Sequence, residues 1–295
     1  MNPLPRWLAP VLRLCVAVAL MALILRFLGV EQVLTQLRRT SPLWLAVAVA
    51  LLSVQVILSA LRWRLTATTL GLQVSRRQAV REYYLSVLGN TVLPGGVLGD
   101  MGRILRFRHQ AGLARAAETV VIERLAGQVA IFGVLALGAV VWFWPTPAAM
   151  AGAVALPVTL AGLALAIRRA GQGGWRPLRL LRNAWAGPEV WRRQLGLSLL
   201  IVTVNLAGFW AAAQAVGLTL GFAAAIFALP LALVAMIVPV TINGWGLREG
   251  MAAALWPLVG ASATGAVAAS VVFGLAALLA ALPGLLALRP APLNS

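Results

Sequence analysis

Three acidic side chains with arginines close by in the sequence are the groups most able to do chemistry in this chain. They lie in or beside apolar stretches, and the pairs are Asp100 with Arg103, Glu123 with Arg124, and Arg248 with Glu249. A lone charge at the centre of a bilayer costs about 2.5–3.5 kcal/mol on insertion scales. If the surrounding sequence crosses a membrane, these groups must pair with one another, reach the interface or line a wet cavity.

The first pair belongs to the stretch NTVLPGGVLGDMGR, residues 90–103. Pro94 and the glycines after it, Gly96 and Gly99 among them, break any helix and free backbone N–H and C=O groups, which lipid cannot satisfy. Asp100 is well placed as the N-cap of a helix that continues through Arg103. A helix N-terminus behind a glycine turn presents N–H donors to an anion. The stretch is therefore either a tight loop before an amphipathic surface helix or a site for an anionic lipid headgroup.

The second pair belongs to TVVIERLAGQVAIFGV, residues 119–134. Glu123 and Arg124 are neighbours, so on a helix they point about 100° apart and do not satisfy each other. Each needs a partner elsewhere, and Arg103 or Arg106 is a candidate for Glu123. The alternative is that both charges lie at the cytoplasmic interface, where long side chains can reach water.

The third pair belongs to PVTINGWGLREGMAAALW, residues 239–256. A proline loosens the end of an apolar segment, and Asn243 and Gly244 form a turn. Gly246 precedes Arg248 and Glu249, which open the next short apolar segment. The order of proline, glycines, charged residues and short helix resembles residues 94–103. It indicates two related halves whose broken elements meet centrally, as in transporters.

Composition places the chain in the membrane. Of its 295 residues, 61% are hydrophobic and 11% are charged, whereas soluble domains average about 45–50% apolar and about 25% charged residues. Seven apolar segments are long enough to cross a hydrocarbon core of about 30 Å. They are Leu8–Leu28, Pro42–Leu61, Thr119–Trp144, Ala148–Ile167, Leu195–Val216, Phe222–Ile242 and Ala263–Leu288.

Two further apolar segments, Tyr83–Leu98 and Met251–Gly260, are short and interrupted by glycine or proline, which is typical of re-entrant or broken helices. We therefore predict an all-α, polytopic membrane bundle of about seven or eight transmembrane helices with one or two re-entrant or broken helices. Residues 1–295 are expected to form a single integral membrane domain.

Charge predicts the orientation. All 24 basic residues are arginines, against 7 acidic ones, and they concentrate in residues 62–82, 101–117 and 168–194. Because short basic loops stay cytoplasmic, we expect a multi-pass protein of the inner (plasma) membrane with a cytoplasmic N-terminus. Residues 83–98 must then enter and leave the membrane on the same side. The sequence does not determine on which side of the membrane the C-terminus lies.

The excess of positive charge favours anionic lipid headgroups as partners rather than nucleic acid. Cys15 and His109 are the single cysteine and histidine of the chain, so no metal site is expected. No lysine is present, and the chain lacks the glycine-rich ATP-binding motif that requires one. We expect no cofactor.

The three stretches together resemble the family that contains the membrane region of lysylphosphatidylglycerol synthases, often called flippase-like integral membrane proteins. The motifs are LPGGVLGDMGR (93–103), ERLAG (123–127) and PVTINGWGLREG (239–250), in this order, and the resemblance covers nearly the whole chain. It implies a bundle of about eight helices with re-entrant pieces. The residues that match the motifs, and that we expect to bind substrate, are Pro94, Gly96, Gly99, Asp100, Arg103, Glu123, Arg124, Asn243, Gly244, Gly246, Arg248 and Glu249.

The resemblance implies that the chain moves or handles a membrane lipid. The lipid is expected to be a phospholipid or a polyprenyl- or hopanoid-type lipid whose phosphate-bearing headgroup binds in an intramembrane polar pocket. The sequence carries no soluble aminoacyl-transferase domain, so we expect no lipid lysinylation and no enzyme activity. Two alternatives stay open, a membrane-embedded transferase acting on lipid-linked substrates and a non-transporting scaffold for a separately encoded lipid-biosynthetic enzyme.

Overall fold

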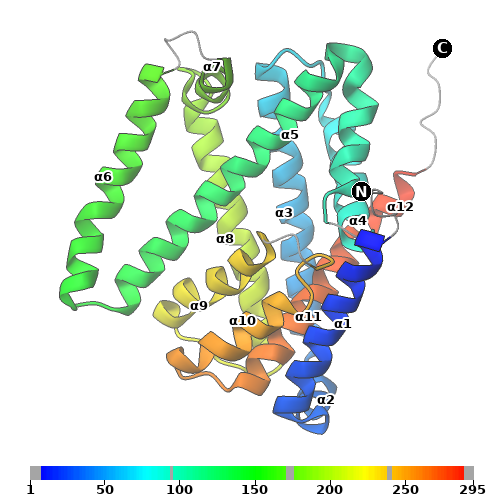
Figure 1. The fold of residues 1–295 in the computed structure, drawn as a ribbon, viewed down its shortest axis with the longest axis vertical. Helices are drawn as coiled ribbons and strands as arrows, with labels where there is room; N and C mark the ends of the chain where they lie inside the picture. The colour runs from blue at the N-terminus through cyan, green and yellow to red at the C-terminus, as the bar shows by residue number, and fades with distance from the viewer. Residues whose placement is uncertain (1–7, 94–95, 171–175, 238–240, 289–295) are drawn as a thin grey trace, which may run out of the picture.

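The computed structural model describes residues 8–93, 96–170, 176–237 and 241–288, and the regular structure in these ranges is helical, as predicted (Figure 1). The longer helices are α1 (Leu8–Leu28), α3 (Pro42–Thr69), α4 (Arg76–Val92), α5 (Leu98–Trp142), α6 (Pro147–Ala170), α8 (Trp191–Ala215), α9 (Phe222–Val234) and α11 (Ala263–Ala281). The shorter ones are α2 (Val30–Arg38), α7 (Arg176–Leu181), α10 (Leu247–Leu255) and α12 (Pro283–Leu286). A π-helical turn spans Arg182–Ala186, and 3-10 turns span Ala235–Ile237 and Trp256–Val259.

Within the described ranges, six helical segments are long and apolar enough to cross a membrane. They are α1, α3, α5, α6, α8 and the segment Ala263–Leu286. The seventh segment expected to cross, residues 222–242, is shorter: α9 ends at Val234, and the 3-10 turn extends it to Ile237. Pro230 removes one backbone donor inside α9. Pro239 follows in the sequence, and a proline biases the residue before it away from helix.

The centre of the bundle is formed by α3, α8 and α11, which pack through small side chains. Fully buried alanines on these helices let the backbones approach closely, as in other membrane bundles; they are Ala48, Ala60, Ala211, Ala212, Ala213, Ala266, Ala268, Ala269 and Ala276. Phe209 of α8 stacks on Phe273 of α11 with ring centroids 4.3 Å apart. This dense centre gives the surrounding elements a rigid frame.

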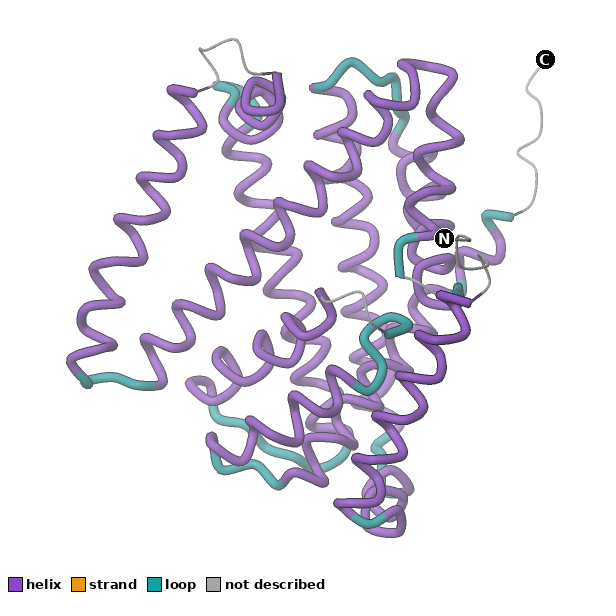
Figure 2. The backbone as a smooth tube through the Cα atoms, in the orientation of Figure 1, coloured by secondary structure: helices purple, strands orange, loops and turns teal. Residues whose placement is uncertain are grey.

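Two helical hairpins enter the bundle from opposite ends (Figures 1 and 2). The first consists of α4 and the beginning of α5, and the second of α9 and α10. Figure 2 shows the described parts of the two hairpin tips, residues 96–97 and 241–246, about half-way between the two ends. The first hairpin is tightly closed: a Cβ atom on Gly99 would lie 1.9 Å from the carbonyl oxygen of Ser86.

The helices α3 and α5 differ from the elements expected from the sequence. Apolar sequence ends near Leu61, but α3 continues to Thr69 and therefore carries Arg62 in a helix rather than in a loop. Helix α5 combines the expected helix after Asp100 with the later apolar segment, and its backbone is non-helical only at Gly112, with φ 82°. Glycine tolerates this positive φ, which lets the chain turn from the hairpin into the long span.

Candidate functional site

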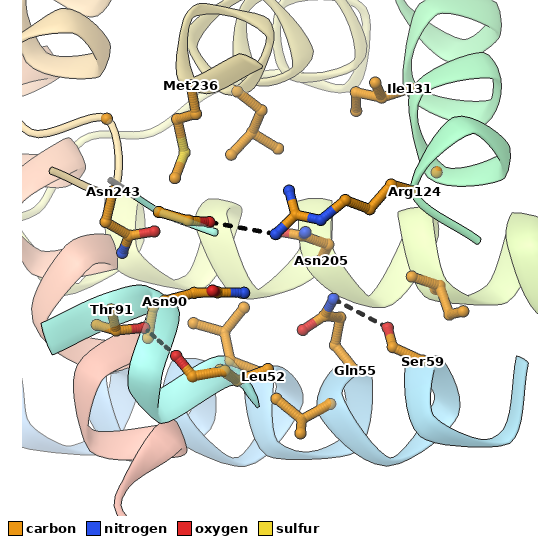
Figure 3. A pocket seen from close by; sticks show the side chains of 18 of the residues that line it. Leu52, Gln55, Ser59, Asn90, Thr91, Arg124, Ile131, Asn205, Met236 and Asn243 are labelled. Carbon is orange, nitrogen blue, oxygen red and sulfur yellow. Dashed lines mark hydrogen bonds between the residues drawn. The ribbon is translucent and has the colours of Figure 1, made fainter. Parts of the chain in front are cut away.

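The tips of the two hairpins line one cavity of about 450 Å³. The first tip contributes Gly96 and Val97, and the second contributes Thr241, Asn243 and Gly244. Helices α3, α4, α5, α8, α9, α10 and α11 and the 3-10 turn Ala235–Ile237 supply the remaining walls. Figure 3 shows polar side chains from several of these elements pointing into the same space. Elements far apart in the sequence therefore meet at one polar cavity in the middle of the bundle.

A charged cluster lies beside this cavity, where α3, α4 and α5 meet. Glu123 accepts hydrogen bonds from Arg62 Nη2 at 2.7 Å and from the hydroxyl of Tyr83 at 3.3 Å. Its other carboxylate oxygen is 3.9 Å from Arg103 Nη2. Arg103 in turn donates to Asp100 at 2.9 Å. All four charged side chains of this chain of contacts are buried, so they compensate one another instead of facing lipid.

Asp100 joins this cluster to the tip of the first hairpin. It accepts hydrogen bonds from Ser86, Arg103 and Arg124. Arg124 also donates to the carbonyl oxygen of Gly96 at 3.2 Å, and its side chain stays 42% exposed. A second cavity of about 240 Å³ lies here, lined in part by Asp100, Glu123 and Arg124. Arg62 and Arg124 both line the two cavities, and Arg124 is the one of these two arginines that also binds the hairpin tip.

Arg103 is held between two aromatic rings. Its guanidinium carbon is 4.6 Å from the ring centroid of Trp63 and 4.8 Å from that of Tyr83. The Nε and Nη1 atoms of Arg103 are buried and have no hydrogen-bond partner in the described part of the protein. Cation–π attraction on both faces replaces part of the missing hydration. The side chain is fixed in place and orients Asp100 and Glu123.

A second charged cluster lies at the start of α10 and is completely buried. Arg248 donates to Glu249 at 2.6 Å and to the hydroxyl and carbonyl oxygens of Ser270 at 2.8 and 2.9 Å. Glu249 also accepts from the backbone N–H of Gly246 at 2.7 Å. Trp245 and Phe273 flank the guanidinium. This cluster anchors the second hairpin to α11, and Arg248 contributes to the wall of the large cavity.

The comparison with known families agrees with the architecture and the motifs. A family model described as the lysylphosphatidylglycerol synthase TM region matches residues 11–284. The chain belongs to this family. No curated protein matches the sequence. The matched range contains both hairpins and both charged clusters, so the chain is a polytopic membrane protein of the lysylphosphatidylglycerol synthase TM family, a lipid-related family.

In this member of the lysylphosphatidylglycerol synthase TM family, the backbone donors expected to bind an anion are already occupied. Asp100 is not the N-cap: α5 begins at Leu98, and Asp100 lies in its first turn. The side-chain oxygen of Asn90 accepts instead from the N–H groups of Gly99 and Asp100 at 2.9 and 3.3 Å. Glu249 fills the same role for Gly246. Asn90 reaches the helix start because the hairpin folds α4 onto α5, a contact that no local pattern reveals.

The residues that the sequence singles out fall into two groups in this family member. Those that line a cavity are Gly96, Asp100, Glu123, Arg124, Asn243, Gly244 and Arg248. Those that hold the clusters and turns behind the cavity walls are Gly99, Arg103, Gly246 and Glu249. Pro94 lies outside the described residues. Of the partners proposed for Glu123, Arg103 is close, whereas Arg106 instead contacts Glu82.

Sequence reasoning missed the main partner of Glu123, Arg62, which it assigned to a loop. A signal was present, because Gln55, Ser59 and Arg62 are spaced four and three residues apart at the end of an apolar run. This spacing puts them on one face of a helix. Asn205 lies in the apolar segment Leu195–Val216 and also lines the large cavity, from α8.

The described residues contain no group of three His, Cys, Asp or Glu side chains close enough to hold a metal ion. The acids of the site instead bind arginines: Asp100 binds two, and Glu123 and Glu249 each bind one at 2.7 Å or less. The chemistry available at the cavity is therefore charge-assisted hydrogen bonding by guanidinium groups that carboxylates hold in position.

Proposed function

We propose that this protein is a lipid translocase that binds an anionic, phosphate-bearing headgroup in the cavity between the two hairpin tips while the hydrocarbon tail stays in the bilayer. The observation that carries the proposal is the cavity itself. It is about 450 Å³ in volume, lies among the candidate membrane spans and is lined by Arg62, Arg124 and Arg248. A guanidinium is well suited to grip the oxygens of a phosphate.

The walls of the cavity leave a path for the tail. Val97 of the first hairpin tip and Ile237 after α9 line the cavity and remain 43% and 36% exposed. We propose that the cavity opens to the apolar surface of the protein beside these two residues. With the headgroup in the cavity, the acyl or isoprenoid chains would lie against this apolar surface and the surrounding hydrocarbon. They would therefore stay in an apolar environment, without the free-energy cost of exposure to water.

Alternating movement of the hairpins is the mechanism that this geometry supports. We propose that each hairpin is a re-entrant element that separates the cavity from one face of the membrane. A bound phosphate would compete with Asp100 for Arg124. Release of Asp100 and of the Gly96 carbonyl, which Arg124 also binds, would loosen the tip of the first hairpin. The second hairpin, anchored by the buried Arg248–Glu249 pair, would stay closed.

Arginines at one end of the bundle support an orientation. The end that contains the α3–α4 turn and α7 is the upper end in Figure 1, and we propose that residues 62–82, 101–117 and 168–194 bring their arginines to it. We propose that this end is cytoplasmic in an inner (plasma) membrane, together with the N-terminus. Arg81 donates to the carbonyl oxygen of Ala287 at 3.1 Å, so the last described residues lie beside α4 and are assigned to the cytoplasmic half as well.

We propose no catalytic role, because the carboxylates that would serve as a general base are engaged by arginines. Purified protein incubated with phospholipid should leave the mass spectrum of the lipid unchanged. A new lipid species formed at a rate that depends on Asp100 or Glu123 would replace the proposal with a membrane-embedded transferase.

A flip assay in vesicles tests the proposal. Protein is reconstituted with phosphatidylglycerol carrying a fluorophore on its acyl chain, and chemical quenching from outside reports the fraction of lipid that changes leaflet. Wild type should flip the lipid faster than protein-free vesicles. Arg124→Ala should lower the rate by about tenfold or more, since one charge-assisted hydrogen bond contributes about 1.5–3 kcal/mol.

Arg193→Ala is the matched control, because Arg193 is an exposed residue near the start of α8, away from the cavity. It removes the same charge and should leave the rate unchanged. Equal rates for wild type and protein-free vesicles would refute transport. If the protein restored synthesis of a lipid in cells that lack it, but flipped no lipid in vesicles, a scaffold for a separate enzyme would be favoured.

A further inference from the structure

The arginines and carboxylates of the first charged cluster differ in number, and this bears on how Arg124 can change partners in the proposed translocase. Among the described residues, the cluster holds three guanidinium groups and two carboxylates, those of Arg62, Arg103, Arg124, Asp100 and Glu123. Glu123 accepts from Arg62. Asp100 accepts from both Arg103 and Arg124. Two cations thus share one carboxylate, and the cluster carries one positive charge in excess.

The exchange proposed above removes one of the two cations from Asp100. Arg124 is the partly exposed arginine of the cluster, and Figure 3 shows its side chain in the large cavity. When Arg124 turns to a phosphate, Asp100 keeps Arg103, whose Nη2 atom is 2.9 Å from Asp100 Oδ1. Asp100 is buried, and a buried carboxylate left without a cation is strongly destabilising. The exchange therefore requires that Arg103 hold Asp100 by itself.

The other charged and titratable groups around Asp100 supply no further cation within the described part of the cluster. Arg62 of α3 is engaged by Glu123, and the hydroxyl of Tyr83 on α4 donates to the same carboxylate. The two remaining ion pairs of the hairpins are balanced one to one; they are Glu82–Arg106 and Arg248–Glu249. Arg103 is therefore the cation on which an ionised Asp100 depends during the exchange.

Arg103 has the donors for this role. Its Nη2 atom already donates to Asp100, and its Nε and Nη1 atoms have no hydrogen-bond partner among the described residues. The rings of Trp63 and Tyr83 stack on the guanidinium, so a turn of the guanidinium within its own plane keeps both cation–π contacts. Such a turn can bring a second donor to the Asp100 oxygen that Arg124 leaves, which gives the two-donor grip that arginine makes on a carboxylate.

We propose that Arg103 is a positioning residue for the exchange: it holds Asp100 alone while a phosphate engages Arg124, and it shares Asp100 with Arg124 again when the phosphate leaves. This rests on the translocation proposed above. Each anion of the loaded site then has its own guanidinium: the phosphate has Arg124, and the carboxylates keep Arg103 and Arg62. No proton has to enter the cluster, and Asp100 stays ionised throughout the cycle.

The wild-type protein provides the first test, because the proposal predicts a flip rate that does not respond to acid. Phosphatidylglycerol with a fluorophore on a short acyl chain is added to the outer leaflet of vesicles that contain the protein, and albumin later extracts the probe that has not flipped. A phosphodiester has no second acidic proton, so the charge of the probe stays constant. The rate should stay constant between about pH 5.5 and about pH 8, a range in which a buried carboxylate without a cation takes up a proton.

Arg103→Gln should make the rate depend on pH. In this variant Asp100 has no cation once Arg124 binds the phosphate, so Asp100 must take up a proton instead. The rate at about pH 8 should fall by about tenfold or more, as expected for the loss of one charge-assisted hydrogen bond. It should rise again as the pH falls, because protonation of Asp100 then becomes easier. A residue that only supported the fold would give a lower rate without this acid response.

Removal of Asp100 should make Arg103 dispensable. The double variant Asp100→Asn with Arg103→Gln lacks the carboxylate that Arg103 serves and again has one guanidinium in excess, so its rate should recover and its pH profile should be flat. Arg103→Lys keeps the charge and should also keep a flat profile. Arg108 and His109 are exposed on the same helix and provide matched controls: Arg108→Gln and His109→Gln should change neither rate nor profile.

The outcomes separate this inference from the function on which it rests. A wild-type rate that rises in acid overturns the inference, and so does a pH-independent loss in Arg103→Gln that Asp100→Asn does not rescue; translocation stands in both cases. No flipping by wild type at any pH overturns translocation, and the inference falls with it. If detergent unfolding shows that Arg103→Gln does not fold, the wild-type profile and the double variant decide, since neither leaves a carboxylate of the cluster without a cation.

Discussion

The buried ion pair between Arg62 and Glu123 provides the sharpest test of how this protein tolerates charge inside the bundle. The two side chains are 4% and 3% exposed, with 2.7 Å between Arg62 Nη2 and Glu123 Oε1. Removal of one partner leaves the other buried and uncompensated, which costs about 3–5 kcal/mol, whereas replacement of both by apolar residues is often close to neutral. We therefore expect strong coupling between the two positions.

The coupling is measured in a double-mutant cycle with Glu123→Leu, Arg62→Met and both together. Glu123→Leu should lower the free energy of unfolding by about 3–5 kcal/mol. Arg62→Met should cost less, because Glu123 keeps the hydroxyl of Tyr83 at 3.3 Å and Arg103 at 3.9 Å. The double variant should be more stable than the sum of the single changes predicts by about 2 kcal/mol or more. Titration of bicelle-reconstituted protein with a denaturing detergent, followed by helical circular dichroism, gives these free energies.

Glu118 and Arg176 form the matched control pair. Their charged atoms are 2.8 Å apart, but the side chains are 23% and 55% exposed. Water screens such a pair, and Glu118→Leu should change stability by less than about 1 kcal/mol. Additive single effects at Arg62 and Glu123, or effects as small as those at Glu118, would refute the argument that the charges of the site stabilise one another in a dry environment.

Two further predictions concern the first hairpin. Gly99→Ala should destabilise the fold by about 1–3 kcal/mol, since its Cβ would lie 1.9 Å from the carbonyl oxygen of Ser86 and overpacking costs that much; Gly133→Ala, on the same helix with no atom near its Cβ, should be neutral or stabilising, and detergent unfolding compares the two. Asn90→Ala should remove both hydrogen bonds to the start of α5 at a cost of about 1 kcal/mol, seen as faster amide exchange in residues 99–102, and unchanged exchange there would contradict the capping role.

The two charged clusters differ in how far their arginines are exposed, and this difference suits them to different roles. Arg248 is fully buried, and its partners Glu249 and Ser270 accept its hydrogen bonds. Arg124 is 42% exposed and faces both cavities. In the mechanism proposed above, Arg124 exchanges a carboxylate for a phosphate and therefore needs access, whereas a cation that keeps a hairpin in place is best enclosed. The second cluster therefore stabilises a wall, and the first offers a charge that can change partners.

Sequence patterning was sufficient for several features. Six of the seven apolar segments expected to cross the membrane lie in helices long enough to do so, because a helix satisfies its own backbone hydrogen bonds in lipid. Glycine and proline at residues 94–99 and 239–246 locate the two breaks, and the order of the motifs identifies the family. Each of these features depends on residues close together in the chain, and local rules suffice for such features.

Only the tertiary structure decided which charges meet. Arg62 lies 61 residues from Glu123, and Asn90 caps a helix that begins after the hairpin tip. Both contacts depend on how α3, α4 and α5 pack, which hydropathy leaves open because many packings bury the same apolar area. The cavity likewise depends on tertiary packing, because its lining includes residues as distant in the sequence as Gly96 and Asn243. Residue types and spacing established that the charged groups must be paired or enclosed if they lie inside a membrane. The packing of the two opposed hairpins decided where the cavity forms, since both hairpin tips contribute to its walls.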